Sequence, residues 1–515
     1  MQKQIIPDTN KLKRTELIFL IAAAVITITA ASTCSPLYPF NPWDDANCFF
    51  TLGRGITKGF VPYRDLYEQK GPLLYLIYAL AALISQKSFI GAWIVECIAS
   101  SVFAIFSWKT VKLFTKPSGF SIALVPVLLG VTYTVRMFNF GGNAEELCFP
   151  LLSIALYFGI RSIVINKELP SNTEALICGL ITASLFWIKY TFIGFMLGFV
   201  VLILILALKQ KEFRKLWSLI WRFLSGFLII TVPILIYFAA SKSLDALFEA
   251  YFYNNIFLYH TASDVTGLAS IPVLGRFIIP ISSIITLSVH YPEYGIMLLL
   301  SLISVFFTGK EYRKRMIVLF AVTFLFALAL IFTKVSFIYY YGFILAYSFA
   351  FLLIPLVKGL NKIVSVYKKN PQLIAIFTSA LAFVLYVVVI INCKNMYLIL
   401  QPKETLVQFR FAETIKETPD AKILTYDVMD AGFYTASDVM PSNRFFCYLN
   451  IENNYPAILE EQNRLINEGY FDYVITSHAC ELESDKYALV KEETCVYIDY
   501  TGEKCLDAYK LYKKV

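Results

Sequence analysis

The chain has 515 residues, of which 58% are hydrophobic and only 16% are charged, and its mean hydropathy is +0.63. Soluble globular proteins carry about 25% charged residues, so this composition argues against that class, against disordered proteins and against small disulfide-stapled domains. The net charge of +8 does not indicate nucleic-acid binding, because the basic residues form short clusters between apolar runs, as in membrane proteins.

Apolar runs of membrane-spanning length recur along the chain, which predicts a polytopic α-helical membrane protein. The first run follows a basic tail. Because many more apolar runs of spanning length follow, we interpret this first run as a membrane span rather than a cleaved signal peptide. We expect about eleven transmembrane helices, near residues 17–36, 89–109, 119–137, 146–161, 173–188, 191–208, 223–240, 291–308, 316–333, 338–357 and 372–392.

Lysine and arginine residues orient these spans. Alternate connections, together with the N-terminal tail, hold 22 basic residues, against nine on the opposite side. Because cytoplasmic loops collect positive charge, we expect a cytoplasmic N-terminus and an extracytoplasmic C-terminal segment. Two more apolar stretches, residues 71–86 and 271–289, are predicted to lie along the outer face. A span at 71–86 would move the basic cluster at 109–116 outside.

The composition changes at residue 393, which separates a multi-span membrane domain (1–393, with an outer loop at 37–88) from a segment without spanning runs (394–515). This segment holds 20 of the 37 acidic residues and carries a net charge of −7. Strand-like stretches near 422–428, 470–476 and 494–500, with a helical stretch near 455–467, predict a small extracytoplasmic α/β domain.

Four cysteines lie in this segment, in a compartment that permits disulfides. Cys495 and Cys505 bracket a turn at Thr501-Gly502 and could face each other across a hairpin. The alternative is that all four, Cys447, Cys480, Cys495 and Cys505, are free thiols. With three histidines in the chain and no metal-ligand spacing of cysteines, no protein-built metal site is predicted.

The first outer loop opens with two adjacent carboxylates, Asp44 and Asp45, just past the end of a span. Carboxylates beside hydrocarbon are costly unless they are solvated or paired. One could therefore act as a general base, with the other orienting it or binding an acceptor. Alternatively both residues cap the following helix, since Asp is a preferred N-cap residue.

Further polar residues lie at later outer turns. Glu145-Glu146 could converge with the first acidic pair on one cavity, or mark a helix start. Lys189 sits in a tight turn between two apolar runs, where it either snorkels to the interface or meets a phosphate. Lys334 occupies an equivalent place, and Tyr339–Tyr341 form either an interfacial belt or a sugar-stacking wall.

The order of these features resembles the GT-C superfamily of membrane glycosyltransferases. Within it, the chain is most similar to the bacterial group of the protein mannosyltransferases and aminoarabinose transferases (glycosyltransferase family 39-like). The resemblance rests on residues 37–75 and 139–150. These carry the Asp44-Asp45 pair, Gly59-x-x-Pro62-Tyr63-Arg64-Asp65, Lys70-Gly71-Pro72 and Gly142-Asn143-x-Glu145-Glu146.

The resemblance implies transfer of a sugar from a polyprenyl-phosphate carrier to an acceptor on the outer face of the bilayer, usually with inversion. The catalytic aspartate maps onto Asp44 or Asp45, and the sequence does not decide which. Glu145, Glu146 and Asp65 would orient the base or the acceptor, and the donor phosphate would bind Arg64, Lys70 and Lys189. A cell-wall polymer, a glycolipid or a protein are all open as acceptors. No Asp-x-Asp motif is present, and the need for a divalent metal stays open.

Two other classes compete with this hypothesis. A transporter or lipid-linked sugar flippase would line its path with polar residues inside the spans, yet few are present and no inverted repeat is visible. A surface-polysaccharide polymerase or ligase also uses polyprenyl-linked sugars, but would place its large functional loop later in the chain.

Overall fold

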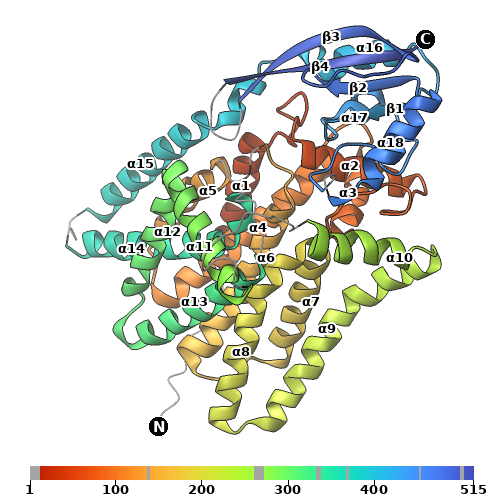
Figure 1. Cartoon of the computed structure of the whole chain (residues 1–515). Coiled ribbons are helices and arrows are strands. Elements are labelled where there is room, and N and C mark those ends of the chain that lie inside the picture. The colour runs from red at the N-terminus through yellow and green to blue at the C-terminus, as the bar shows by residue number, and fades with distance from the viewer. Residues whose placement is uncertain are drawn as a thin grey trace.

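The computed structural model describes residues 12–135, 138, 140–259, 272–331, 338–366, 370–451, 454–498 and 504–515. Most of the basic tail, Lys334 and the turn at Thr501-Gly502 lie outside these ranges. Figure 1 shows a large helical body below a small, mixed sheet near the C-terminus. This confirms the predicted class, a polytopic α-helical membrane protein with a small α/β unit at its C-terminal end.

Each predicted span overlaps one long helix. These helices are α1 (Arg14–Ala31), α4 (Ile90–Phe114), α5 (Leu124–Thr134), α6 (Ala144–Gly159), α7 (Asn172–Lys189), α8 (Ile193–Gln210), α9 (Phe213–Ala240), α12 (Pro292–Ser304), α13 (Lys310–Leu330), α14 (Phe343–Val366) and α15 (Pro371–Ile391). One further long helix, α11 (Pro272–His290), covers the stretch that was predicted to lie along the outer face.

Length and apolarity qualify seven helical stretches of the described residues as membrane spans, or eight if the bent pair α11 and α12 forms one span. The stretch over residues 172–210 contains two predicted spans, because the chain reverses at Lys189. Gln210, at the end of α8, donates a hydrogen bond to the Lys167 carbonyl just before α7. The number of eleven stays a prediction, as does the placement of residues 271–289 along the outer face. Those residues form α11, which meets α12 at 117°.

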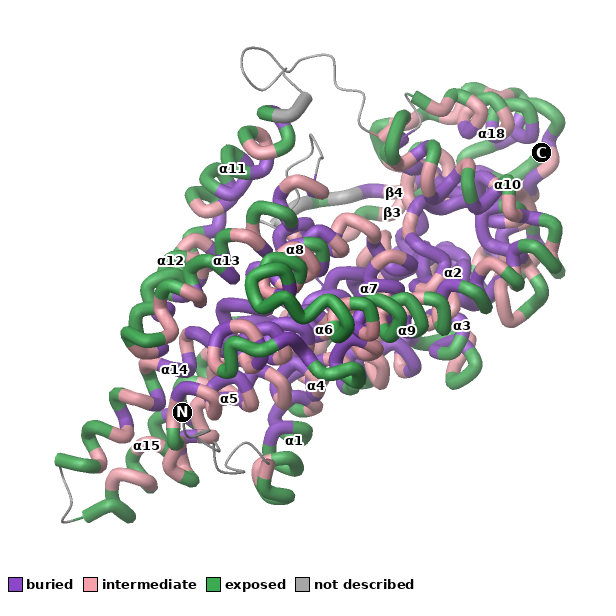
Figure 2. The backbone as a smooth tube through the Cα atoms, turned by 90° about the horizontal axis from the view of Figure 1, so that it is seen from below, coloured by how far each residue is buried: buried purple, intermediate pink, exposed green. Residues whose placement is uncertain are grey.

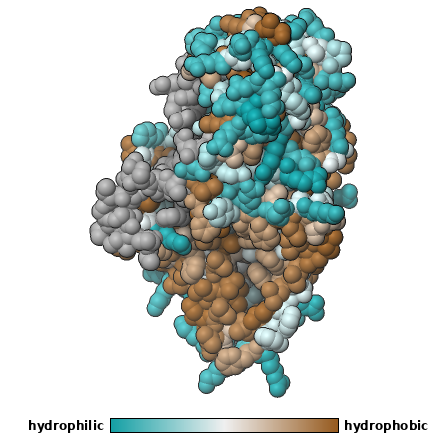
Figure 3. Space-filling model, turned by 45° about the vertical axis from the view of Figure 1, so that its right-hand side comes forward, coloured by the Kyte–Doolittle hydropathy of each residue, from teal (hydrophilic) through white to brown (hydrophobic). Residues whose placement is uncertain are grey.

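The burial of the helices matches a bilayer environment. α4, α6 and α14 are the most buried of the candidate spans, whereas most residues of α9 and α15 are exposed or half-buried (Figure 2). On α15 the exposed residues include Leu373, Ile376, Phe377 and Phe383. Figure 3 shows apolar surface over the helical body and hydrophilic surface over the C-terminal end. Outward apolar faces on several long helices identify a multi-pass membrane protein.

The C-terminal unit is a four-stranded sheet in the order β1-β2-β4-β3. β1 (Ile423–Thr425) pairs in parallel with β2 (Tyr473–Ser477), whereas β4 (Lys504–Lys514) pairs antiparallel with β2 and with β3 (Tyr487–Ile498). Three short helices pack around the sheet, namely α16 (Val407–Ile415), α17 (Phe433–Ser437) and α18 (Ala457–Glu468). The expected hairpin is present, but its register sets Cys495 opposite Asp507, and Cys505 opposite Tyr497.

The C-terminal unit docks on α2 (Asp44–Thr57), the first helix of the outer loop, through one buried face. Arg54, fully buried, reaches Asp438 at 3.0 Å and the Tyr434 carbonyl at 3.1 Å. One turn earlier, Thr51 donates to the buried Asp430. A further turn back, the Sγ atoms of Cys48 and Cys447 lie 3.9 Å apart. Cys447 therefore faces the membrane part rather than another cysteine of its own unit.

Candidate active site

Lys70 is positioned by a constrained turn that follows the Pro-Tyr-Arg-Asp stretch. Tyr63 is buried and has φ 68°, a left-handed conformation that is rare for a bulky residue. Its hydroxyl donates to the Lys70 carbonyl at 2.7 Å. Gly71 then donates to the Ile188 carbonyl at 3.0 Å, and a Cβ on Gly71 would lie 2.0 Å from the Trp187 carbonyl oxygen. The glycine thus allows the two turns to touch.

The Lys-Gly-Pro spacing also explains where the next helix begins. Pro72 stands at the first position of α3 (Pro72–Ile84), where its missing N–H and fixed φ cost nothing. The predicted helix at 71–86 is therefore present. Gly71 precedes it at the point of closest approach to α7, so this short motif places Lys70 beside the turn that carries Lys189.

Lys189 ends α7 in an extended conformation, with φ −155° and ψ 95°, before the 3-10 turn Tyr190–Phe192. Its side chain is 8% exposed and forms an ion pair with Glu145. The ammonium also lies 3.8 Å from the centre of the Tyr340 ring and 5.2 Å from that of Tyr339. A buried cation held by one carboxylate and two ring faces is desolvated, yet it keeps favourable partners.

The structure separates the two residues of the Glu145-Glu146 pair. Gly141 and Gly142 have φ of +87° and +81° and turn the chain into α6. Glu146 accepts hydrogen bonds from the backbone of Gly142 at 2.9 Å and of Asn143 at 3.2 Å, and so caps the start of the helix. Glu145 points to Lys189 instead. The helix-start alternative therefore describes Glu146, whereas Glu145 does not line the pocket itself and contacts it only through Lys189.

The first acidic pair opens α2, whose N-cap position is held by Trp43 rather than by an aspartate. Asp44 and Asp45 occupy the first turn, and successive helical residues point about 100° apart. Asp45 lies 4.0 Å from the Lys70 ammonium, and Glu68 lies 3.6 Å from it. Glu68 is 2% exposed and also accepts from Tyr75. Two carboxylates thus flank Lys70.

Burial and these neighbouring charges shift the pKa values of Asp45 and Lys70. Burial raises the pKa of Asp45 above its ordinary value of 3.8, although the Lys70 ammonium opposes this. Burial lowers the pKa of Lys70, but the Asp45 and Glu68 carboxylates outweigh it and the net pKa lies above its ordinary value. Lys70 therefore stays cationic, while Asp45 is a better proton acceptor than an exposed aspartate.

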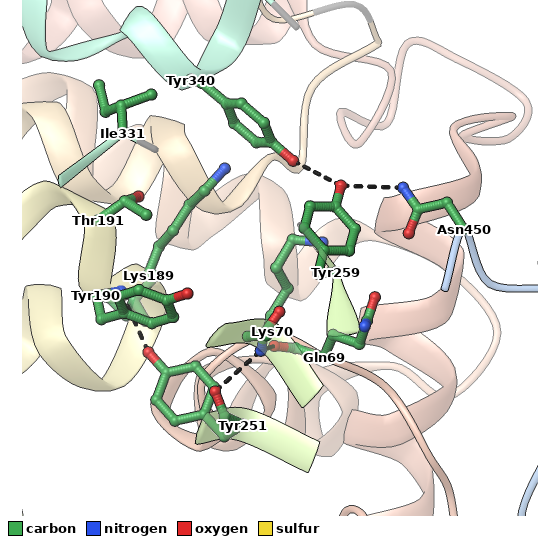
Figure 4. A pocket seen from close by; sticks show the side chains of 12 residues that line it. Gln69, Lys70, Lys189, Tyr190, Thr191, Tyr251, Tyr259, Ile331, Tyr340 and Asn450 are labelled. Atoms are coloured by element: carbon green, nitrogen blue, oxygen red, sulfur yellow. Dashed lines mark hydrogen bonds between the residues drawn. The ribbon is translucent and has the colours of Figure 1, made fainter. Parts of the chain in front are cut away.

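Both lysines line one pocket with about 560 Å³ of empty volume, part of it open to solvent. Its walls come from the outer loop, the α7–α8 turn, the segment after α10 (Leu244–Leu247), the residue after α13, the 3-10 turn before α14 and the C-terminal unit. Figure 4 shows how they meet: Asn450 donates to the Tyr259 hydroxyl at 3.1 Å, and that hydroxyl bonds to Tyr340 at 2.9 Å. Tyr340 thus stands in the cavity wall, where the sugar-stacking alternative would place it.

Arg64 and Asp65 are not brought into this cavity. Arg64 is exposed, donates to Asp65 at 2.8 Å and reaches the Ser241 carbonyl at 2.8 Å. Both residues line a separate open pocket with Lys58 and Arg444. The left-handed backbone at Tyr63 turns the chain here, which nothing in the residue types indicates.

Several cavity residues were not singled out from the sequence. Gln69 immediately precedes Lys70 in the outer loop, as does Glu68, which contacts Lys70 without lining the cavity, and this adjacency was the signal that could have found them. Tyr251, Tyr259 and Asn450 come from segments far along the chain, and no local pattern marks them.

The described residues contain no group of three or more His, Cys, Asp or Glu side chains suited to hold a metal ion. Around the cavity, Glu68 and Glu145 are committed to lysine and tyrosine partners. This donor set fits an anion held by ammonium groups better than a divalent cation.

No protein-family model matches the chain, and no curated protein matches its sequence. Its fold is similar to the crystal structure of ArnT from Cupriavidus metallidurans in the apo state. The TM-score is 0.51 and the identity 10%, over 96% of this chain and 97% of that one. The crystal structure of the same ArnT bound to undecaprenyl phosphate matches over the same shares, with a TM-score of 0.47 and 11% identity. ArnT is an aminoarabinose transferase with the GT-C fold, and this chain has that fold.

Proposed function

We propose that this GT-C-fold protein transfers a sugar from a polyprenyl-phosphate-linked donor to an acceptor at the extracytoplasmic face of the membrane. The observation that carries the proposal is the pair of lysines, Lys70 and Lys189, beside Asp45 at one pocket. A buried ammonium group (Lys189) and a half-buried one (Lys70) next to apolar helices suit a phosphate attached to a lipid. The adjacent carboxylate supplies a proton acceptor.

In the proposed reaction, an acceptor hydroxyl oxygen attacks the anomeric carbon of the donor while Asp45 takes the hydroxyl proton. The bond between the anomeric carbon and the phosphate oxygen breaks, and the lipid phosphate leaves with the bonding electron pair. One such displacement inverts the anomeric centre. Lys70 and Lys189 stabilise the negative charge that develops on the phosphate, which in a desolvated site contributes substantially to the rate.

The remaining carboxylates have supporting roles in this proposal. Glu145 holds Lys189 in position, and Glu68 holds Lys70 through the ion pair at 3.6 Å. Glu146 shapes the turn before α6, which sets the position of Glu145. Arg64 and Asp65 have no assigned part, because they face a different pocket.

The positive charge of the connections supports the outer location of the site. α8 begins beside Lys189 and its 18 residues span about 27 Å, close to the thickness of the hydrocarbon core. At its far end lies the basic connection of Lys209, Lys211, Arg214 and Lys215. Since such clusters stay cytoplasmic, the cavity belongs at the opposite face.

Transfer assays with purified protein and a panel of radiolabelled polyprenyl-phosphate sugars test the proposal. Asp45→Asn should reduce release of the sugar at least about 100-fold, since it removes the base, while Asp44→Asn should retain most activity. Both variants should melt near the wild-type temperature. If no donor is bound or consumed by the wild type, or if Asp45→Asn remains fully active, the proposal is wrong.

A further inference from the structure

The Nε2 atom of the Gln69 side chain is buried beside the cavity without a hydrogen bond. The residue is 6% exposed, and its Nε2 atom has no partner among the residues that the structure describes. A buried donor left unpaired is unfavourable, so such groups in native proteins usually serve a ligand, a water or a functional state. Gln69 lines the cavity directly beside Lys70, where a ligand could complete it.

A second amide, Asn450 of the C-terminal unit, lies on the same side of the cavity. In Figure 4 both amides stand on the right of the opening, whereas Lys189 and Thr191 stand on the left. Asn450 is exposed at the rim, and its Nδ2 is held by Tyr259 at 3.1 Å. The cavity therefore carries two uncharged amides at one edge, next to Lys70, and Lys189 at the opposite edge.

The ammonium groups and the carboxamides of the cavity recognise different chemical groups. Ammonium groups donate hydrogen bonds and carry positive charge, so they favour phosphate. A carboxamide both donates and accepts without charge, so it matches a hydroxyl, which does the same. A sugar joined to a phosphate has this same division into a charged and a neutral, hydroxyl-bearing part.

We infer that Gln69 and Asn450 form a subsite for the hydroxyl groups of the transferred sugar, while the lysines hold the phosphate. This rests on the proposed function and extends it to the C-terminal unit, which then takes part in recognition of the sugar. Gln69, being buried, makes the stronger contribution, and Asn450 at the rim makes the weaker one.

Two radiolabelled probes distinguish recognition of the sugar by the amides from recognition of the phosphate by the lysines. They are a polyprenyl-phosphate sugar that the wild type consumes, and sugar-free undecaprenyl phosphate. Gln69→Met preserves the length of the side chain and should weaken binding of the sugar-bearing probe about tenfold, with less than a twofold effect on the sugar-free probe. Asn450→Ala should show the same selectivity at about threefold. Lys189→Met should weaken both probes.

Gln69→Glu serves as a second variant, since it keeps the acceptor oxygen and removes the donor, and Gln401→Met serves as a control outside the cavity. Melting temperatures show whether each variant folds. Equal weakening of both probes by Gln69→Met and Gln69→Glu, or no effect on either, overturns the subsite while leaving the lysine site intact. A wild type that binds neither probe refutes the proposed function itself.

Discussion

At the scale of single residues, Asp45 combines burial with a cationic neighbour, and these two influences act on its proton in opposite directions. Burial raises its pKa above the ordinary 3.8, whereas Lys70 favours the ionised form. If Asp45 is the base, activity is full above this pKa and lost as the pH falls through it. We predict an acidic limb in kcat/KM that lies above pH 3.8 and moves to higher pH in Lys70→Met.

The control for this limb is Asp44→Asn, which should leave its position unchanged, because Asp44 is not the proposed base. The measurement is the pH dependence of kcat/KM with a donor that the wild type consumes. A limb that moves to lower pH in Lys70→Met would contradict the assignment, since removing a nearby positive charge can only make an aspartate easier to protonate.

Asp430 supplies a residue-scale prediction on stability rather than activity. Burial raises its pKa to about 6, despite hydrogen bonds from Thr51 and the Gly432 backbone. The folded state therefore binds this proton more tightly than the unfolded state. Asp430 therefore contributes most to the free energy of unfolding below about pH 4. As the pH rises through 6, this contribution falls by up to about 3 kcal/mol.

We accordingly predict that Asp430→Asn stabilises the protein relative to wild type above pH 6, and that this advantage shrinks toward pH 4. Melting temperatures of the detergent-purified proteins across this range provide the measurement. The exposed Asp485→Asn serves as the control and should track the wild type. An advantage of Asp430→Asn that is independent of pH would show that ionisation of Asp430 is not its cause.

At the scale of elements, the junction of α3 with the α7–α8 turn depends on Gly71. A Cβ there would lie 2.0 Å from the Trp187 carbonyl oxygen and 2.4 Å from its carbon, and both are backbone atoms that cannot easily move. We predict that Gly71→Ala separates Lys70 from Lys189 and weakens binding of undecaprenyl phosphate at least about tenfold, with a lower melting temperature.

Gly359→Ala, within α14, is the matched control. A Cβ at Gly359 meets nothing within 4 Å, so this change should be neutral or stabilise the helix by roughly 1 kcal/mol. Normal lipid-phosphate binding by Gly71→Ala would mean that the two turns need not touch.

Some helices and strands could be predicted from local sequence patterns, and others could not. Apolar runs locate the membrane helices because hydropathy in a bilayer is a local property, and Gly71-Pro72 marks the start of α3 for a similarly local reason. Strand β4 was anticipated only near Cys505, as one arm of the possible hairpin, since the lysines and tyrosines that follow resemble polar coil. It is a strand because β2 and β3 pair with it on both sides.

The candidate site was predicted only in part, for a different physical reason. The pair Asp44-Asp45, Glu145 and Lys189 were singled out because charges beside apolar runs are conspicuous. Lys70 was singled out through the resemblance to the GT-C superfamily. Their pairing, and the contribution of Asn450, depend on contacts between distant segments. The exclusion of Arg64 depends on the backbone of Tyr63, whose positive φ no residue preference suggests.

At the scale of the whole molecule, Arg54 and Asp438 join the membrane part to the C-terminal unit. Arg54 is fully buried, whereas the Asp438 side chain is 37% exposed and also binds Lys87, which is 74% exposed. Asp438→Ala leaves a buried charge, but the Tyr434 carbonyl still accepts from it. We expect a loss somewhat below the roughly 3–5 kcal/mol typical of broken buried pairs.

Lys87→Met removes the other cation from the same carboxylate and should cost less than about 1 kcal/mol, because that pair is exposed. Arg54→Met combined with Asp438→Ala should recover much of the lost stability. Melting temperature and limited proteolysis of the C-terminal unit report the result. Equal effects of Lys87→Met and Asp438→Ala would refute the special role of the buried pair.

The cavity wall formed by Asn450 has a consequence for the order in which the protein is made. Ribosomes add roughly 5–20 residues per second, so Asn450 emerges about 20–80 seconds after Lys70. Once Lys189 has also been made, the nascent chain holds Asp45, Gln69 and both lysines, and it lacks only the part of the wall that Asn450 forms. In the inferred subsite, the contribution of Asn450 is therefore the last part to be added during synthesis.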